Sequence, residues 1–115
     1  MSYRILGNRL RMHRRKAGLS QRELGQLVGY KRRWPVSRHE HSRTAPPLLI
    51  ALAYEAVFGV PVSAIFTGIH ETVAQGIEQS IGAFEKELRD RNSKGRRPNE
   101  TAQKLEWLTQ RRNMA

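Results

Sequence analysis

Two short helices joined by a turn are predicted by the sequence GLSQRELGQLVGYKRRWPVSRHE, residues 18–40. Ser20 is a favoured N-cap residue, and Glu23, three residues later, completes a capping-box pattern. The leucines and the valine that follow form one apolar helical face, and Gly29 is a typical helix end. The first of the two helices is therefore short and is marked at both ends.

Pro35 marks the beginning of the second helix. A backbone amide in the first turn of a helix has no intrahelical acceptor, so proline is tolerated there. Because proline disfavours helical backbone in the residue before it, we expect Trp34 to be extended and the helix to run from Pro35 to His41. Residues 30–34, YKRRW, then form the turn, and the missing side chain of Gly25 allows the two helices to pack closely.

The second helix is predicted to have a core side and an open side. With about 100° between successive residues, Val36, His39 and Glu40 lie on one side, and the apolar Val36 directs that side to the core. Arginine can bind guanine through two hydrogen bonds, serine and histidine can reach base edges, and tryptophan can pack on a sugar or a thymine methyl. The candidate base-reading residues on the open side are Arg33, Trp34, Ser37, Arg38 and His41.

Four further residues are candidates for contacts with DNA phosphates. Gln21 stands at the N-terminus of the first helix, where its amide and the free backbone N–H groups can hold a phosphate together. The others are basic side chains of that helix and of the turn, Arg22, Lys31 and Arg32.

Positive charge is concentrated in the first third of the chain. Residues 1–45 hold twelve lysines and arginines and two glutamates, a net charge of +10 within a total of +11. Such a concentration attracts a polyanion, either nucleic acid or an anionic membrane surface. A membrane-surface helix would have to come from residues 3–18, the one basic amphipathic candidate, and we favour nucleic acid.

Three more helices are predicted around the same core. Residues 3–17 form a basic amphipathic helix. The pair Pro46–Pro47 opens a helix that is apolar nearly all round and is therefore expected to be buried. A short helix follows Pro61 and stops at Gly68, which closes a compact five-helix unit. The apolar residues of these last two helices include Leu48, Leu49, Ile50, Leu52, Ala53, Val57, Val62, Ile65 and Phe66.

The rest of the chain has a different pattern. Apolar residues at spacings of three and four predict a helix over residues 71–91. These residues are Ala74, Ile77, Ile81, Phe84 and Leu88. They form either a layer within the chain or a dimer seam, and we favour the dimer seam. A polar basic linker, residues 92–100, leads to a last amphipathic segment that begins at Thr101 and in which Trp107 is a packing residue.

Other kinds of site find little support in the sequence. The chain has no cysteine, which excludes disulfides and cysteine-type zinc sites and fits a reducing cytoplasm. His39 and His41 point to different sides of the predicted helix, so we do not interpret them as a metal site. No nucleophile–base spacing, phosphate-binding glycine loop or paired-carboxylate motif is present, so we expect no enzyme activity and no cofactor. Without a signal peptide or membrane span, a cytoplasmic protein is predicted.

The sequences GLSQRELGQLVGY, residues 18–30, and VSRHE, residues 36–40, resemble the helix-turn-helix of the lambda-repressor/Cro-like (XRE) transcriptional regulators. Residues 46–68 are similar to the fourth and fifth helices of that family. The resemblance covers about residues 3–68 and implies an all-α, five-helix lambda-repressor-like DNA-binding domain, to which we assign residues 1–69. From the different pattern of the remaining sequence we expect residues 70–115 to be a C-terminal helical extension for dimerisation or partner contact. It also implies a sequence-specific regulator that binds double-stranded DNA, usually as a homodimer on a near-palindromic operator, and we expect a repressor.

The resemblance assigns roles to individual residues. It implies that Gln21 contacts a phosphate and that Ser37 and Arg38 lie at the DNA. It further implies a structural ion pair between Arg14 and Glu40.

The chain departs from the family pattern in three places. One additional residue lies between Gly29 and Glu40, which leaves the register of the base-reading residues open. His39 stands where an apolar residue is usual, and Ser42 where a glycine usually ends the helix.

Two alternative functions are compatible with the sequence. In the first, residues 70–115 bind a protein partner, as in an antitoxin-like or accessory module, and DNA binding is autoregulatory. In the second, the net charge of +11 makes the chain a general binder of nucleic acid, including RNA. A co-purifying partner would favour the first, and loss of binding in excess non-specific duplex would favour the second.

Overall fold

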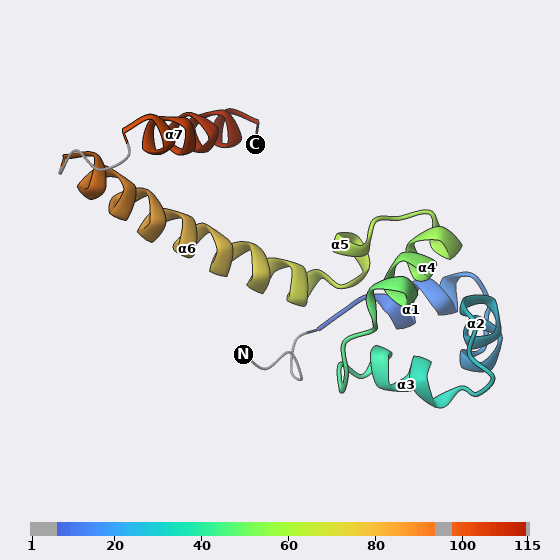
Figure 1. Cartoon of the computed structure of the whole chain (residues 1–115). Coiled ribbons are helices and arrows are strands. Elements are labelled where there is room, and N and C mark those ends of the chain that lie inside the picture. The colour runs from blue at the N-terminus through green and yellow to red at the C-terminus, as the bar shows by residue number, and fades with distance from the viewer. Residues whose placement is uncertain (1–6, 94–97, 115) are drawn as a thin grey trace. The chain divides into compact units, whose positions relative to one another are not determined.

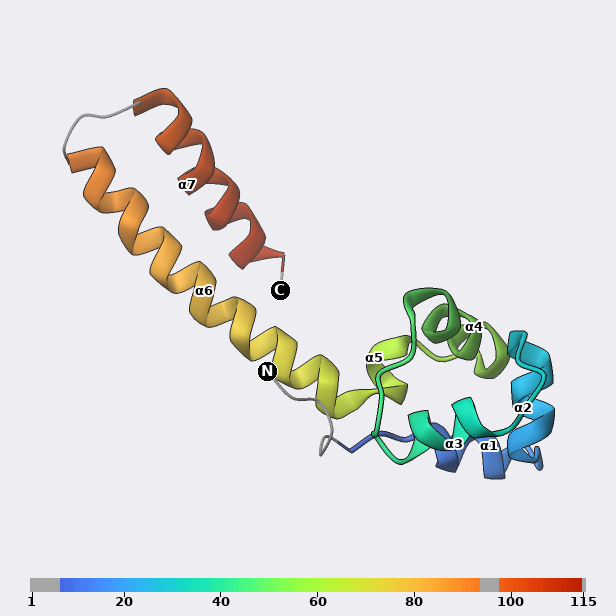
Figure 2. The same ribbon diagram turned by 60° about the horizontal axis from the view of Figure 1, so that its bottom comes forward.

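All regular structure in the described residues, 7–93 and 98–114, is helical in this computed structural model (Figure 1). The predicted all-α class is confirmed. The chain divides into two compact units, Met1–Val73 (unit 1) and Ala74–Ala115 (unit 2), and Figure 2 shows each from a second direction. Unit 1 contains α1 Leu10–Lys16, α2 Gln21–Val28, α3 Trp34–Glu40, α4 Leu48–Phe58, α5 Val62–Ile65 and the first turns of α6 Thr67–Ser93.

The five short helices of unit 1 surround one apolar core. Its buried residues are Leu10, Leu24, Val28, Val36, Tyr54, Ile65 and Phe66. Removing one large aliphatic side chain from water contributes roughly 1.5–3 kcal/mol, so this cluster is the main force that holds the helices together. Val36 is fully buried, which fixes the side of α3 that faces away from the core.

The first helix is shorter than predicted. α1 begins at Leu10 because the residues before it make bonds outside a helix. Oδ1 of Asn8 accepts the N–H of Leu10 at 3.0 Å, and the N–H of Arg9 donates to the carbonyl of Ile65 at 2.7 Å. The part of the prediction that falls on residues 3–6 lies outside the described residues.

The apolar sequence of α4 predicted a helix buried all round, and this prediction was wrong. Ala51 and Tyr54 are buried, whereas Leu48 and Leu49 are 72% and 79% exposed and Leu52 is also exposed. A helix on the outside of a small unit presents one side to the core, and Tyr54 fills that side.

The predicted helix stop at Gly68 was also wrong. α6 begins at Thr67, with Phe66 between it and the end of α5, and continues through Gly68. A single glycine costs a helix about 1 kcal/mol. Ile69, in the same turn, packs against the core of unit 1 and offsets this cost.

Unit 2 is a hairpin of α6 and α7, Pro98–Asn113, which lie side by side in both views (Figures 1 and 2). Arg111 and Arg112 of α7 each approach a carboxylate of α6, Glu78 and Glu85, to 2.7 Å. The side chains buried in the hairpin are Leu88, Thr101 and Leu108. A layer within the chain, one of the two alternatives for the apolar stripe of α6, is therefore present.

The linker predicted over residues 92–100 is shorter than expected. α7 begins at Pro98 instead of Thr101, because proline is tolerated in the first turn of a helix. Residues 94–97 lie outside the described residues. The division of function between residues 1–69 and 70–115 stays a prediction.

Candidate nucleic-acid interface

The N-terminus of α2 is held by a reciprocal capping box. Oγ of Ser20 accepts the N–H of Glu23 at 3.0 Å, and Oε1 of Glu23 accepts the N–H of Ser20 at 2.8 Å. These hydrogen bonds hold the pKa of the Glu23 carboxyl below its usual range. At the other end, Gly29 has a φ of 102° and ends the helix in the left-handed region. Both predicted ends of α2 are confirmed.

Close packing of α2 on α3 depends on Gly25. A Cβ atom at this position would lie 3.2 Å from the backbone oxygen of Arg32 and 3.7 Å from Cγ2 of Val36. The predicted close approach at Gly25 is confirmed, and it fixes the path of the turn that leads into α3.

The start of α3 differs from the prediction by one residue. Trp34 is the first helical residue rather than an extended one, and Arg33 before it has helical backbone angles, φ −78° and ψ −22°. Proline disfavours helical backbone in the preceding residue but does not forbid it. Pro35 is itself buried against the unit, and this packing outweighs the local preference. The helix also ends at Glu40, one residue before the predicted end.

The core side of α3 is anchored by a buried polar pair. His39 is 4% exposed, and its Nδ1 lies 2.8 Å from the hydroxyl oxygen of Tyr54. Burial lowers the pKa of His39 from 6.5 to about 4, because a charged ring is poorly solvated there, and burial likewise raises the pKa of Tyr54. At neutral pH the pair is therefore uncharged. The imidazole that stands in place of the usual apolar residue therefore makes a hydrogen bond across the core.

A charged network connects α1, α2 and α3. Arg14 donates from Nε to Oε2 of Glu40 and from Nη2 to Oε1 at 3.2 Å, and from Nη1 to the carbonyl of Leu19 at 2.8 Å. The Glu40 side chain is only 1% exposed. Nε2 of Gln21 donates to the same Oε1 at 3.2 Å. The structure thus brings Arg14 and Glu40 together, and it turns the amide nitrogen of Gln21 toward Glu40.

The C-terminal end of α3 is held by Asn8, a residue that the sequence reasoning missed. Nδ2 of Asn8 donates to the carbonyl of His39 at 2.8 Å and to Oγ of Ser42 at 3.0 Å. Ser42 has a φ of 55°, a left-handed conformation that favours glycine. The signal in the sequence was an asparagine close to a helix start, but its partners lie far along the chain.

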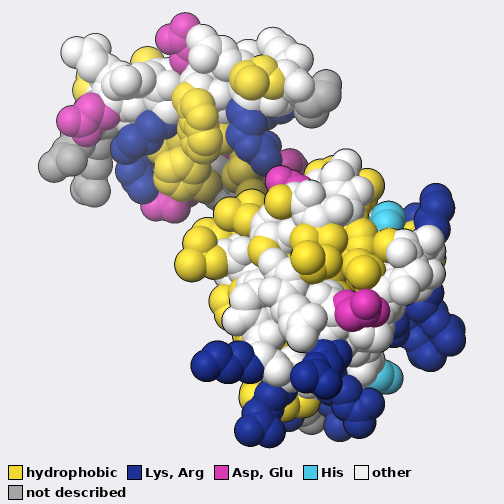
Figure 3. Space-filling view, turned by 90° about the vertical axis from the view of Figure 1, so that its right-hand side faces the viewer, with side chains coloured by type: hydrophobic (Ala, Val, Ile, Leu, Met, Phe, Trp, Pro, Cys, Tyr) yellow, Lys and Arg dark blue, Asp and Glu magenta, His cyan; other side chains and the backbone are white. Residues whose placement is uncertain are grey.

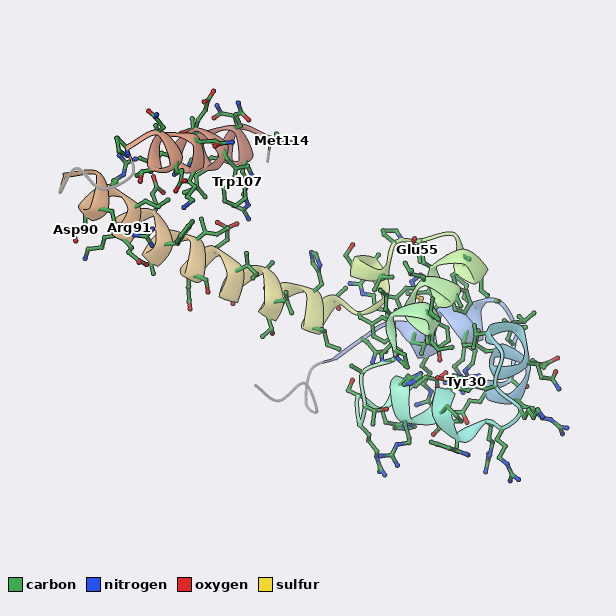
Figure 4. All side chains as sticks on the ribbon, in the orientation of Figure 1. Tyr30, Glu55, Asp90, Arg91, Trp107 and Met114 are labelled. Carbon is green, nitrogen blue, oxygen red and sulfur yellow. The ribbon has the colours of Figure 1, made fainter. Side chains whose placement is uncertain are left out.

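The side of α3 opposite Val36 is open. Figure 4 shows long side chains that extend outward from α3, and Figure 3 shows lysines and arginines gathered at the end of unit 1 where α3 lies. Trp34 is 58% exposed. Of the predicted base-reading residues, Ser37 is half-buried, and the exposed ones are Arg33, Trp34, Arg38 and His41. The structure therefore places these five residues together, on α3 and the residues that flank it.

His41 is oriented by the last turn of α3. Its Nδ1 lies 2.7 Å from the carbonyl oxygen of Ser37 and 3.5 Å from the Ser37 hydroxyl. Because a carbonyl oxygen only accepts, the proton of the neutral ring lies on Nδ1, and Nε2 is left as an acceptor that is available to a ligand.

The predicted phosphate-contacting residues do not share one environment. Arg22, Lys31 and Arg32 are exposed, on α2 and in the turn before α3, whereas Gln21 is half-buried in the Glu40 network. The three cations are therefore accessible to a polyanion, and Gln21 is a positioning residue as well as a candidate contact.

The residues that the structure describes include no group of three side chains able to hold a metal ion. None of the helices within 7–93 and 98–114 combines the length and apolar character of a membrane span.

One comparison with known proteins, with a family profile, agrees with this geometry, although no curated protein matches the chain. The profile of the family described as "Helix-turn-helix domain" matches residues 5–63, which include α1 to α4 and the turn that packs on Gly25. With half of its length matched, the chain belongs to the helix-turn-helix domain family, which is typical of XRE-like regulators.

Proposed function

We propose that this chain is a sequence-specific DNA-binding regulator of transcription, which acts as a repressor by binding a near-palindromic operator as a homodimer. The observation that carries the proposal is the two-sided character of α3. Val36 and His39 fix one side in the core, while Arg33, Trp34 and Arg38 extend from the other. A rigid helix with exposed hydrogen-bond donors is what the major groove of DNA accepts.

The base-reading roles follow from the chemistry of each exposed group. Arg33 and Arg38 carry guanidinium groups that can bind O6 and N7 of guanine together. Ser37 can donate to or accept from a base edge, and Trp34 can pack on a sugar or a thymine methyl. Nδ1 of His41 is held by the Ser37 carbonyl, which leaves Nε2 as the ring nitrogen that can reach a base edge.

The phosphate-contacting roles fall to the cations around α3. Arg22 lies on α2, and Lys31 and Arg32 lie in the turn, so they flank α3 on its N-terminal side. Gln21 contributes through its backbone N–H and its remaining amide atoms at the N-terminus of α2, where the helix dipole favours an anion. These contacts supply affinity without sequence information.

We propose no enzymatic activity for this chain and a location in the cytoplasm. The family is typically non-enzymatic, and we assign no catalytic step or cofactor to the chain. As a regulator of transcription it acts in the compartment that holds the DNA, which in our proposal is the cytoplasm.

Selection of oligonucleotides from a random pool tests the proposal. An inverted repeat is the expected result, with half-sites about one helical turn apart. The Arg38→Ala variant should lose roughly 5- to 150-fold of the preference for the selected site, because a base contact provides about 1–3 kcal/mol. The Arg22→Ala variant should weaken binding to all duplexes alike. If both variants weakened binding uniformly, the assignment of base-reading residues would be wrong, and no enriched motif at all would contradict sequence-specific binding.

A further inference from the structure

Unit 2 is too small to complete a core of its own. The hairpin buries Leu88, Thr101 and Leu108. In contrast, Ile77 on α6 is 48% exposed, and Trp107 within α7 and Met114 just after its end are also exposed (Figure 4). Chains near or below about 40 residues usually need a disulfide, a metal or oligomerisation to be stable. The chain has no cysteine, and the described residues include no metal-ligand cluster. Of these three ways to stabilise unit 2, oligomerisation remains.

A groove between α6 and α7 marks where a second element would fit. Its volume is about 450 Å³. Ile81, Leu108 and Met114 contribute apolar side chains to its lining, beside Gly82 and four charged residues, and the space-filling view shows apolar side chains flanked by charged ones on this part of the molecule (Figure 3). Ile77 lies one turn from Ile81 and extends the same apolar stripe along α6.

The charges that line the groove balance one another. Glu78 and Glu85 of α6 face Arg111 and Arg112 of α7, and the two ion pairs between them each have a distance of 2.7 Å. A wall with no net charge does not attract a polyanion such as DNA or a strongly charged peptide. It fits a partner with the same pattern of paired charges beside apolar residues, and a second hairpin of this chain has that pattern.

We propose that the α6–α7 hairpin pairs with the hairpin of a second copy of this chain, so that two grooves close into a four-helix bundle. This inference rests on the proposed function only in that an inverted-repeat operator requires two copies. A twofold pairing is isologous, so the groove of one copy contacts the same surface of the other. Burial of Ile77, Ile81 and Met114 from both copies provides the apolar core that a single hairpin lacks.

Two glycines of α6 make a matched pair of variants. A Cβ atom added at Gly82 or at Gly76 would meet nothing within 4 Å in the single chain, so the backbone at both positions tolerates a side chain. Gly82 lines the groove, and Gly76 is not among the residues that line it. Gly82→Lys therefore places a charge in the proposed interface, and Gly76→Lys adds the same charge to the same helix outside it.

Sedimentation equilibrium of the full chain tests the proposal without DNA. Wild type and Gly76→Lys are expected at twice the chain mass of 13.2 kDa. Gly82→Lys is expected to raise the dimer dissociation constant at least about tenfold, with unchanged helicity by circular dichroism. The proposal is overturned if wild type is a monomer, if the two lysine variants behave alike, or if Leu49→Gln on α4 dissociates the dimer while Gly82→Lys does not. Since no DNA is present, these outcomes are independent of the oligonucleotide selection that tests sequence reading.

Discussion

Nδ1 of His39 and the hydroxyl oxygen of Tyr54 lie 2.8 Å apart inside the core of unit 1, and both side chains are buried. The pair joins the core side of α3 to α4. Because His39 also offers its carbonyl to Asn8, three segments of the chain meet at one residue of α3. The orientation of the open side of α3 therefore depends on a neutral imidazole.

Acid should destabilise unit 1 through His39. Its pKa is about 4 in the folded state and about 6.5 when unfolded, so between these values the unfolded chain binds more protons. Stability is full above pH about 6.5 and falls as the pH falls to about 4, by up to about 3 kcal/mol. Urea denaturation at pH 7 and pH 4.5 measures this loss. His39→Gln, which keeps a hydrogen-bonding side chain without titrating in this range, should lose much less; an equal loss in that variant would sink the assignment to His39.

Removing one partner of the Arg14–Glu40 ion pair should destabilise the fold more than replacing both partners together. Glu40→Met leaves Arg14 without its carboxylate in a largely buried site, and we expect a loss of roughly 3 kcal/mol in the free energy of unfolding. Arg14→Met alone should cost a similar amount, while the double variant should cost less than the sum. Chemical denaturation of the four proteins in a double-mutant cycle gives the coupling. Strict additivity would show that the pair does not stabilise the fold.

Features that depend on neighbours in sequence were predicted well. The capping box of Ser20 and Glu23, the glycine end at Gly29 and the close approach at Gly25 all follow from local backbone chemistry. The sidedness of α3 followed from helical spacing once Val36 was assigned to the core.

Features that depend on distant neighbours were not predicted. Asn8 reaches the carbonyl of His39, 31 residues further on, and no local pattern announces that contact. The apolar sequence of α4 does not reveal how many elements surround it, so the exposure of Leu49 was missed. Trp34 became helical because the packing of Pro35 outweighed a local backbone preference.

Gly25→Ala should destabilise unit 1 and weaken DNA binding together. The new methyl group would lie 3.2 Å from the backbone oxygen of Arg32, a tighter contact than nearly all real ones, so the turn before α3 must shift by a few tenths of an ångström. Overpacking of this kind typically costs about 1–3 kcal/mol. Gly76→Ala on α6 is the matched control, because that position is open, does not line the groove that we propose as the dimer interface, and alanine favours a helix. Thermal unfolding of both variants should show a lower Tm for the first only; a wild-type Tm for Gly25→Ala would mean that the turn adapts without strain.

The two tryptophans of the chain allow DNA contact to be located by fluorescence. In a Trp107→Phe variant the only indole is Trp34, which is 58% exposed at the start of α3. Addition of the selected duplex should shift its emission to shorter wavelengths, because the ring leaves water when it packs on a sugar or a base methyl. In a Trp34→Phe variant the remaining Trp107 lies on α7, outside the proposed DNA-binding surface, and its emission should not respond to DNA beyond what dilution causes. A response from Trp107 in place of Trp34 would move the DNA contact from α3 to the hairpin and would contradict the proposed reading surface.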